Sequence, residues 1–299
     1  MAKLTIVADS TSSLEKKVRD QYSIDYCRMM VAFGAEGEEI PASLDYEEVN
    51  FHDYYQKMRD GMRIYTDMVP IQEFEDVFTR HLEAGEDVLY VSCSSALSGS
   101  YKASLPIIEE LSKKYPERKI AAVDSLGSNA SQKYMCIEAA KLAQDGKTFE
   151  EVKAWLEENR LKIQDVATVG SLTYLSRAGR VKASKAFFGN LFGVKPLLYS
   201  NELGQNIAFD KAKGRKNSII MLAEKIASTI TDPENQEQIY IVHGDCQADA
   251  EVLAAKLYEL IPGLKHIDIS PLDPIVGASC GPETLIVGFY GNMIQFKGE

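Results

Sequence analysis

Short apolar runs alternate with longer amphipathic stretches in the first half of the chain. The apolar runs cover residues 4–8, 88–92 and 120–123, and each is followed by a polar loop. Because continuous apolar runs that alternate with helical patterns are typical of βαβ units, we predict a parallel, Rossmann-like sheet with helices on both faces. The helical patterns cover residues 14–22, 46–61, 71–84, 99–115 and 132–145, and Thr66 lies in the connection between the second and the third.

The pattern changes near residue 148. Residues 149–159 form a charged amphipathic stretch, and a region richer in glycine follows it. Helical spacing then covers residues 211–230 and 248–260, with apolar runs at residues 239–242, 267–269 and 284–290. This mixture predicts a mixed α/β sheet in the second half. We therefore expect an α/β protein of two domains, residues 1–165 and residues 166–299.

Composition and charge narrow the class of protein. The 299 residues are 45% hydrophobic and 26% charged, as in an ordinary globular protein. A net charge of −11 disfavours nucleic acid and anionic membrane surfaces as partners. Five cysteines without a C-x-x-C pair indicate a reduced, cytoplasmic location. We expect neither a signal peptide nor a membrane span, since the longest uncharged stretch, residues 88–101, is shorter than the roughly 18 residues that a span needs.

A cluster of serines follows the apolar run at residues 88–92 and begins the next helix. Its members are Ser92, Ser94, Ser95, Ser98 and Ser100. Free amides at a helix start, together with hydroxyl donors, can hold a carboxylate or a phosphate. The alternative is a helix cap surrounded by ordinary loop.

Three further segments each allow two interpretations. Arg177 and Arg180 either clamp an anion or lie in a solvated turn, and residues 187–194 either line an apolar slot or belong to the core. Residues 275–282 read as a small-residue loop that can approach a ligand closely. His243 follows an apolar run, but too few ligands surround it in sequence for a metal site.

Several catalytic motifs are absent from the sequence. It contains no G-x-x-x-x-G-K-[ST] loop, no G-x-G-x-x-G fingerprint, no G-x-S-x-G elbow and no H-E-x-x-H. We therefore expect no cofactor and no metal. The sequence offers hydroxyls, helix starts, arginines and a long apolar stretch. This combination suits an amphiphilic ligand with an anionic head group and an apolar tail.

Seven segments, in order along the whole chain, resemble the DegV family of bacterial fatty-acid-binding proteins. They are VADSTSSL at residues 7–14, SSALSGSYKAS at 94–104, VDS at 123–125, LTYLSRAGRV at 172–181, GNLFGVKPLL at 189–198, HGD at 243–245 and GASCGPETLIVGF at 277–289. The resemblance implies a two-domain α/β protein that encloses one long-chain, palmitate-like fatty acid. Its tail would lie in an apolar tunnel to which the second domain contributes.

The resemblance also implies where the carboxylate binds. By motif position it would meet Thr66 and Ser98, with Ser95 of the same loop as the near alternative. Further candidates are Ser94, Arg177 and Ser279, the last of which stands where many family members have a histidine. The family role would be a carrier without catalytic activity that presents its fatty acid to a separate ATP-binding fatty acid kinase subunit.

Two other functions stay open. One is an acyl hydrolase or transferase on the same scaffold, with Ser98 or Cys280 as nucleophile and His243 or His266 as base. The other is a carrier of a different anionic amphiphile.

Overall fold

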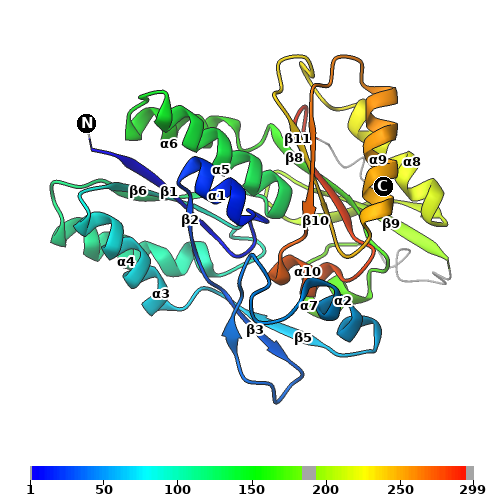
Figure 1. The fold of residues 1–299 in the computed structure, drawn as a ribbon, viewed down its shortest axis with the longest axis horizontal. Coiled ribbons are helices and arrows are strands. Elements are labelled where there is room, and N and C mark those ends of the chain that lie inside the picture. The colour runs from blue at the N-terminus through cyan, green and yellow to red at the C-terminus, as the bar shows by residue number, and fades with distance from the viewer. Residues whose placement is uncertain (1, 184–192, 294–299) are drawn as a thin grey trace.

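The structure is a computed structural model that describes residues 2–183 and 193–293. A four-stranded parallel sheet forms its N-terminal part, in the order β2-β1-β6-β7 (Figure 1). Its strands are β1 (Leu4–Asp9), β2 (Asp25–Cys27), β6 (Asp87–Ser92) and β7 (Ile120–Asp124). Successive residues of β1 point into two different cores, since Ile6 and Ala8 pack in one and Val7 packs in the other. A sheet that is buried on both faces explains why the apolar runs are continuous rather than alternating.

Helices cover both faces of this sheet, as predicted. Helices α3 and α4 lie on one face, and α1, α5 and α6 on the other (Figure 1). The helices of the N-terminal half of the chain are α1 (Lys16–Tyr22), α2 (Phe51–Arg59), α3 (Ile71–Glu83), α4 (Ser100–Lys114), α5 (Asn129–Gln144) and α6 (Phe149–Asn159).

The sequence analysis did not predict a small antiparallel sheet that the structure contains. It has the order β4-β3-β5, with β3 (Met30–Phe33), β4 (Ile40–Pro41) and β5 (Ile64–Asp67). Thr66 therefore lies on a strand, not in a simple connection. The strand is four residues long and its partner lies about thirty residues earlier, so local periodicity does not reveal it.

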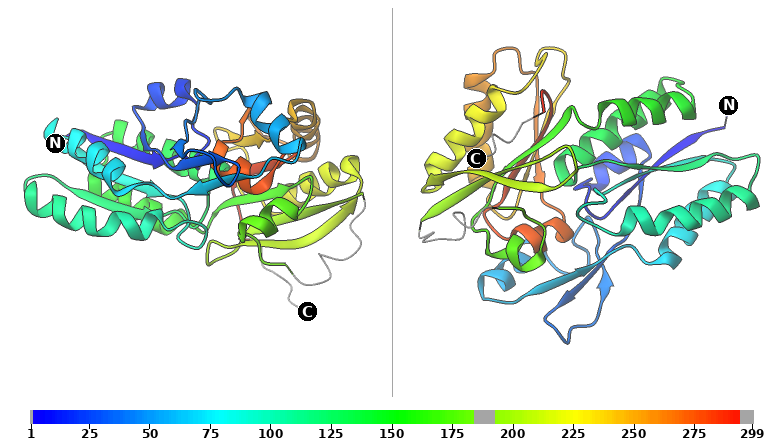
Figure 2. Two further views of the ribbon diagram at one scale, coloured as in Figure 1. Left: turned by 90° about the horizontal axis from the view of Figure 1, so that it is seen from below. Right: turned by 180° about the vertical axis from the view of Figure 1, so that it is seen from behind.

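The C-terminal part is a six-stranded mixed sheet in the order β10-β9-β8-β13-β11-β12, in which β11 and β12 form the parallel pair. Its strands are β8 (Ile163–Thr168), β9 (Val194–Ser200), β10 (Asn206–Lys213), β11 (Ile239–His243), β12 (Ile267–Pro271) and β13 (Leu285–Tyr290). Its helices are α7 (Thr173–Ala178), α8 (Arg215–Ala227), α9 (Gln247–Leu260) and α10 (Pro274–Cys280). Helices α8 and α9 pack side by side against this sheet (Figure 2). The mixed second sheet confirms the predicted fold class.

Two predicted elements of this half are wrong in detail. The helix expected at residues 211–230 begins at Arg215, because Gly214 turns the chain with φ +81° after β10. The loop expected at residues 275–282 is largely helix α10, which Asp273 caps through its carboxylate and Pro274 begins. Most of the apolar slot expected at residues 187–194 lies outside the described residues, and its last residue, Val194, begins β9.

Helix α5 joins the two larger sheets, because it contacts β1 on one side and β8, β11 and β13 on the other. A methyl group on Gly288 of β13 would come within 2.5 Å of the Ala130 backbone, so only glycine allows this approach. The domain boundary near residue 165 stays a prediction; β8, which spans it, belongs to the six-stranded sheet. No helix within residues 2–183 and 193–293 is long and apolar enough to cross a membrane.

Candidate functional site

A cavity opens where the N-terminal sheet, β5 and α10 meet, and we call it the outer cavity. It contains about 700 Å³ of space without atoms, part of it open to solvent. Its lining residues are Thr11, Met29, Thr66, Asp67, Met68, Cys93, Leu97, Ser98, Gly99, Ser128, Leu175, Arg180, Asn206, Ile275, Val276, Ser279 and Cys280. The structure thus brings together Thr66, Ser98 and Ser279, three of the six site residues expected from the sequence.

Residues 93–99, which we call the serine loop, connect β6 to α4. Two carboxylates from the neighbouring strands fix its backbone: Asp9 Oδ2 accepts a hydrogen bond from Cys93 N–H (2.9 Å), and Asp124 Oδ1 accepts one from Ser95 N–H (3.1 Å). Asp9 ends β1 and Asp124 ends β7, on either side of β6. The loop therefore lies at the carboxyl edge of the parallel sheet, where open α/β sheets bind their ligands.

Ser98 is half-buried and lines the outer cavity. Its Oγ lies 3.0 Å from Ser100 Oγ and accepts a hydrogen bond from Ser100 N–H (3.2 Å). Local bonds thus hold the hydroxyl at the start of α4, beside the free amides of that helix.

Thr66 reaches the same cavity from the edge strand β5. Gly34 N–H donates to Arg63 O (2.9 Å), and the antiparallel register pairs Val31 with Thr66. Since hydrogen-bonded pairs alternate in an antiparallel ladder, the backbone N–H of Thr66 points away from β3, toward the open edge of the sheet. Thr66 therefore offers two donors, its hydroxyl and its amide.

The remaining predicted residues lie elsewhere. Ser94 is buried and its Oγ donates to Gly204 O (2.9 Å), so that it ties the serine loop to the turn between β9 and β10. Neither Ser94 nor Ser95 lines the outer cavity. Arg177 is exposed and lines a neighbouring cavity together with Arg63 and Arg180. Among the described residues, no carboxylate forms an ion pair with any of these three arginines.

Arg180 also lies at this site, although of the two arginines considered as an anion clamp only Arg177 was placed among the carboxylate candidates. Arg180 lines both the outer cavity and the neighbouring one, and its Nε donates to Leu97 O of the serine loop (3.1 Å). Its place in the same arginine block as Arg177 was visible in the sequence. Only the turn of the chain after α7 decides which of the two arginines faces the serine loop.

A second, inner cavity continues from the outer one toward the six-stranded sheet. The two share Ser128, Leu175, Asn206, Val276 and Cys280. Much of the remaining inner wall is apolar, from Ala167, Val169, Leu198, Tyr199 and Ile286. Asp165 and Ala167 of β8, and Val169 just after it, face this cavity, while Val166 packs on the opposite side of the sheet.

One carboxyl interrupts the apolar wall. Burial raises the pKa of Asp165 to about 7, although Ser131 donates to it from both its hydroxyl (2.6 Å) and its amide (2.9 Å). Near neutral pH this group therefore exists partly in the uncharged form, which an apolar cavity tolerates better.

Comparison with known proteins shows the family. A family model described as "Uncharacterised protein, DegV family" matches residues 3–292 of the chain. The chain belongs to the DegV family. A DegV domain-containing protein of Clostridium perfringens is 36% identical over 292 residues, which cover 98% of this chain and 99% of that protein.

Solved structures of DegV proteins share the fold. A DegV lipid-binding protein of Thermotoga maritima is 25% identical with a TM-score of 0.83, over 98% of this chain and 100% of that one. The fatty acid kinase B3 protein of Streptococcus pneumoniae, solved with linoleic acid, is 16% identical with a TM-score of 0.81, over 98% of this chain and 100% of that one. The predicted family is confirmed.

The two cysteines that line the outer cavity of this DegV-family chain, Cys93 and Cys280, are not activated as nucleophiles. Burial raises the pKa of Cys280 to about 12 and that of Cys93 well above its ordinary value, so both thiols stay protonated near neutral pH. His243 is buried against Phe51, and burial lowers its pKa. No histidine lines either cavity, and no group of metal ligands occurs in the described parts of the chain.

Proposed function

We propose that this protein binds one long-chain fatty acid, with its carboxylate in the outer cavity and its tail in the inner one. The observation that carries this proposal is the meeting of Thr66 and Ser98 at the entrance to an inner cavity with a largely apolar wall. Hydroxyl and amide donors offset the cost of removing a carboxylate from water. The description of the Thermotoga maritima relative as a lipid-binding protein supports the same function.

The tail supplies most of the binding energy in this proposal. Each methylene contributes about 0.8 kcal/mol when it leaves water, so a palmitate-like chain has ample driving force. The hydroxyls and the arginines decide which head group is accepted, because only an anion gains charge-assisted hydrogen bonds from them.

The protein acts as a carrier rather than as an enzyme, and it presents its fatty acid to a separate ATP-binding kinase subunit. Support comes from the absence of nucleotide motifs in the sequence, from the protonated cysteines, and from the description of the Streptococcus pneumoniae relative as a fatty acid kinase B protein. All five cysteines are free, in keeping with a location in the reducing cytoplasm.

The deciding experiment is mass spectrometry of the lipid extracted from the natively folded protein. We expect a single class of long-chain fatty acid at about one per chain. If the extracted lipid is a different anionic amphiphile, that amphiphile replaces the fatty acid in this proposal. If the protein hydrolyses an added acyl ester and Ser98→Ala abolishes the hydrolysis, the result favours the acyl hydrolase instead.

Substitution of the two hydroxyl residues tests the site. We expect the double variant Thr66→Ala with Ser98→Ala to lose roughly a hundredfold in fatty acid affinity, since two hydrogen bonds to a charged group disappear. Competition against a fluorescent fatty acid measures the loss, and unchanged thermal unfolding of the lipid-free protein shows an intact fold. Ser95→Ala, outside the cavity, serves as the control. A full loss with Ser95→Ala and none with Ser98→Ala would assign the carboxylate to Ser95 instead.

A further inference from the structure

Ser100 lies directly behind the proposed carboxylate site. It is fully buried at the first position of α4, and it does not line either cavity. Its Oγ accepts a hydrogen bond from Val69 N–H (3.2 Å) and lies 3.0 Å from Ser98 Oγ. Ser100 thus contacts both segments that carry the proposed ligands, the serine loop and the chain just after β5.

The proton of Ser100 has one acceptor. A serine hydroxyl has one proton to donate, and a buried proton without an acceptor is costly. Val69 N–H is itself a donor, so among the described residues Ser98 Oγ is the acceptor that remains for Ser100 Oγ–H. The direction of the bond between the two serines is therefore from Ser100 to Ser98.

This direction determines what Ser98 can offer to a ligand. Ser98 Oγ accepts from Ser100 Oγ–H and from Ser100 N–H, which uses both of its lone pairs. Its own proton has no acceptor among the described residues, and the side chain faces the outer cavity. Ser98 is then a donor toward the cavity and not an acceptor.

We propose that Ser100 is a positioning and specificity-determining residue that fixes the Ser98 hydroxyl as a donor and so selects an ionised head group. The proposal rests on the proposed fatty acid site. An ionised carboxylate only accepts hydrogen bonds and matches this donor. A fatty alcohol has a proton of its own, for which Ser98 has no lone pair left.

The test compares palmitate with hexadecanol. Both are competed against a fluorescent fatty acid on lipid-free protein at about pH 8, where a carboxyl group is ionised. In Ser100→Ala a lone pair of Ser98 becomes free for the alcohol proton, and the carboxylate loses a donor held in place. We expect the ratio of palmitate to hexadecanol affinity to fall about tenfold relative to wild type.

A double-mutant cycle separates this role from a merely structural one. In a Ser98→Ala background, adding Ser100→Ala should leave the ratio unchanged, because its effect passes through Ser98. Ser104→Ala is the matched control: its hydroxyl is equally buried on the same helix, but it donates to Tyr101 O (2.8 Å). If Ser100→Ala does not fold, Ser100→Cys keeps a weak donor and should lower the ratio by less.

Each outcome has a definite meaning. An equal loss of both affinities in Ser100→Ala, or the same fall of the ratio with and without Ser98, overturns the role of Ser100 and leaves the fatty acid site standing. A wild type that does not bind palmitate overturns the proposed function and this inference with it.

Discussion

Serines of one short segment have different roles, and their residue type alone does not separate them. Ser94 ties the loop to Gly204, Ser98 faces the outer cavity, and Ser100 lies buried behind it. What separates them is where each side chain points when the chain leaves β6 and turns into α4. The residue type of Asp67 does not reveal its position either. It follows Thr66 directly, it is exposed, and it lines the same outer cavity.

Asp67 is expected to weaken the binding of an anion. Its carboxylate lines the cavity that would hold the fatty acid carboxylate, and like charges repel. Asp67→Asn should raise fatty acid affinity by a factor of about three at low salt and by less at high salt, because salt screens the repulsion. Asp60→Asn, an exposed change at the end of α2, is the control. Equal affinity of wild type and Asp67→Asn at low salt would show that the charge of Asp67 does not reach the ligand.

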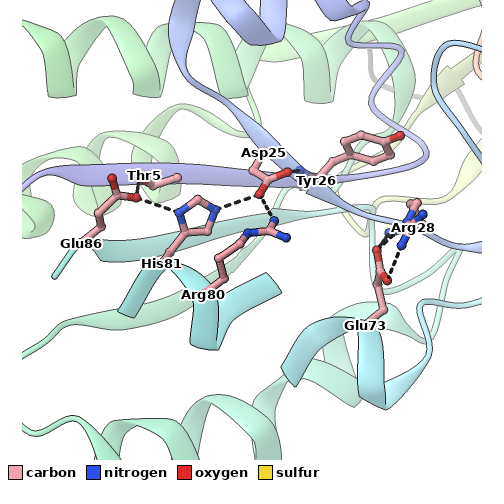
Figure 3. Close-up of polar contacts among 8 residues, drawn as sticks. All are labelled: Thr5, Asp25, Tyr26, Arg28, Glu73, Arg80, His81 and Glu86. Atoms are coloured by element: carbon pink, nitrogen blue, oxygen red, sulfur yellow. Dashed lines mark hydrogen bonds and ion pairs between the residues drawn. The ribbon is translucent and has the colours of Figure 1, made fainter. Parts of the chain in front are cut away.

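At the scale of elements, one histidine joins four segments of the N-terminal part. His81 of α3 lies between Asp25 of β2 (2.8 Å) and Glu86 (2.7 Å), which also accepts from Thr5 of β1 (Figure 3). Burial by itself would lower the pKa of His81, but the hydrogen bonds and charges of the two carboxylates raise it above the ordinary value. Burial by itself would raise the pKa of both carboxyls, but hydrogen bonds from His81 and the Tyr26 amide lower that of Asp25 to about 2. Hydrogen bonds from Lys3, Thr5 and His81 lower that of Glu86 to about 2.

His81 should make stability depend on pH. The unfolded histidine titrates near pH 6.5, and the folded one titrates higher. Its stabilising effect is therefore complete below about pH 6.5 and is lost as the pH rises through the folded pKa. We expect His81→Gln to have a lower free energy of unfolding than wild type, as measured with urea. The difference between the two proteins should be larger at about pH 6 than at about pH 9.

The control for this pH dependence is His266→Gln, which removes an exposed histidine. That variant should keep the same difference from wild type at both pH values. A difference between wild type and His81→Gln that does not change with pH would mean that the histidine is not charged in the cluster.

At the scale of the whole molecule, α5 holds the two larger sheets together. Lys133 of α5 is fully buried, and its Nζ donates to Asp268 (2.7 Å) and Ser270 (2.9 Å) of β12, above the ring of Tyr240. A buried lysine is tolerated only with such partners. The ion pair therefore joins a helix of the N-terminal part to a strand of the C-terminal sheet.

Loss of this lysine should destabilise the protein strongly. Lys133→Met leaves Asp268 without its cation, and we expect a loss of about 3 kcal/mol in the free energy of unfolding. Lys141→Met, on the same helix, breaks a partly exposed pair with Glu237 and should cost less than about 1 kcal/mol. Chemical denaturation of both variants measures the difference, and similar losses would show that the buried pair contributes no more than the exposed one.

The sequence by itself determined the fold class and the family. Continuous apolar runs predict strands buried on both faces, so β1, β6, β7 and the parallel sheet could be read directly. The motifs around the serine loop and the arginine block pointed to the family that the comparison confirms. Thr66 and Ser98 could be proposed from those motifs, and their role as carboxylate ligands stays a prediction.

Only the tertiary structure decided how these residues meet. Strand β5 exists because β3 pairs with it from about thirty residues away, and α10 is helical because Asp273 caps it inside a buried setting. Likewise, no local pattern shows that Ser100 has Ser98 as its acceptor, that Arg180 turns toward Leu97, or that the outer cavity continues into the inner one. Contacts between distant segments depend on packing and on the direction of each hydrogen bond, which local periodicity does not encode.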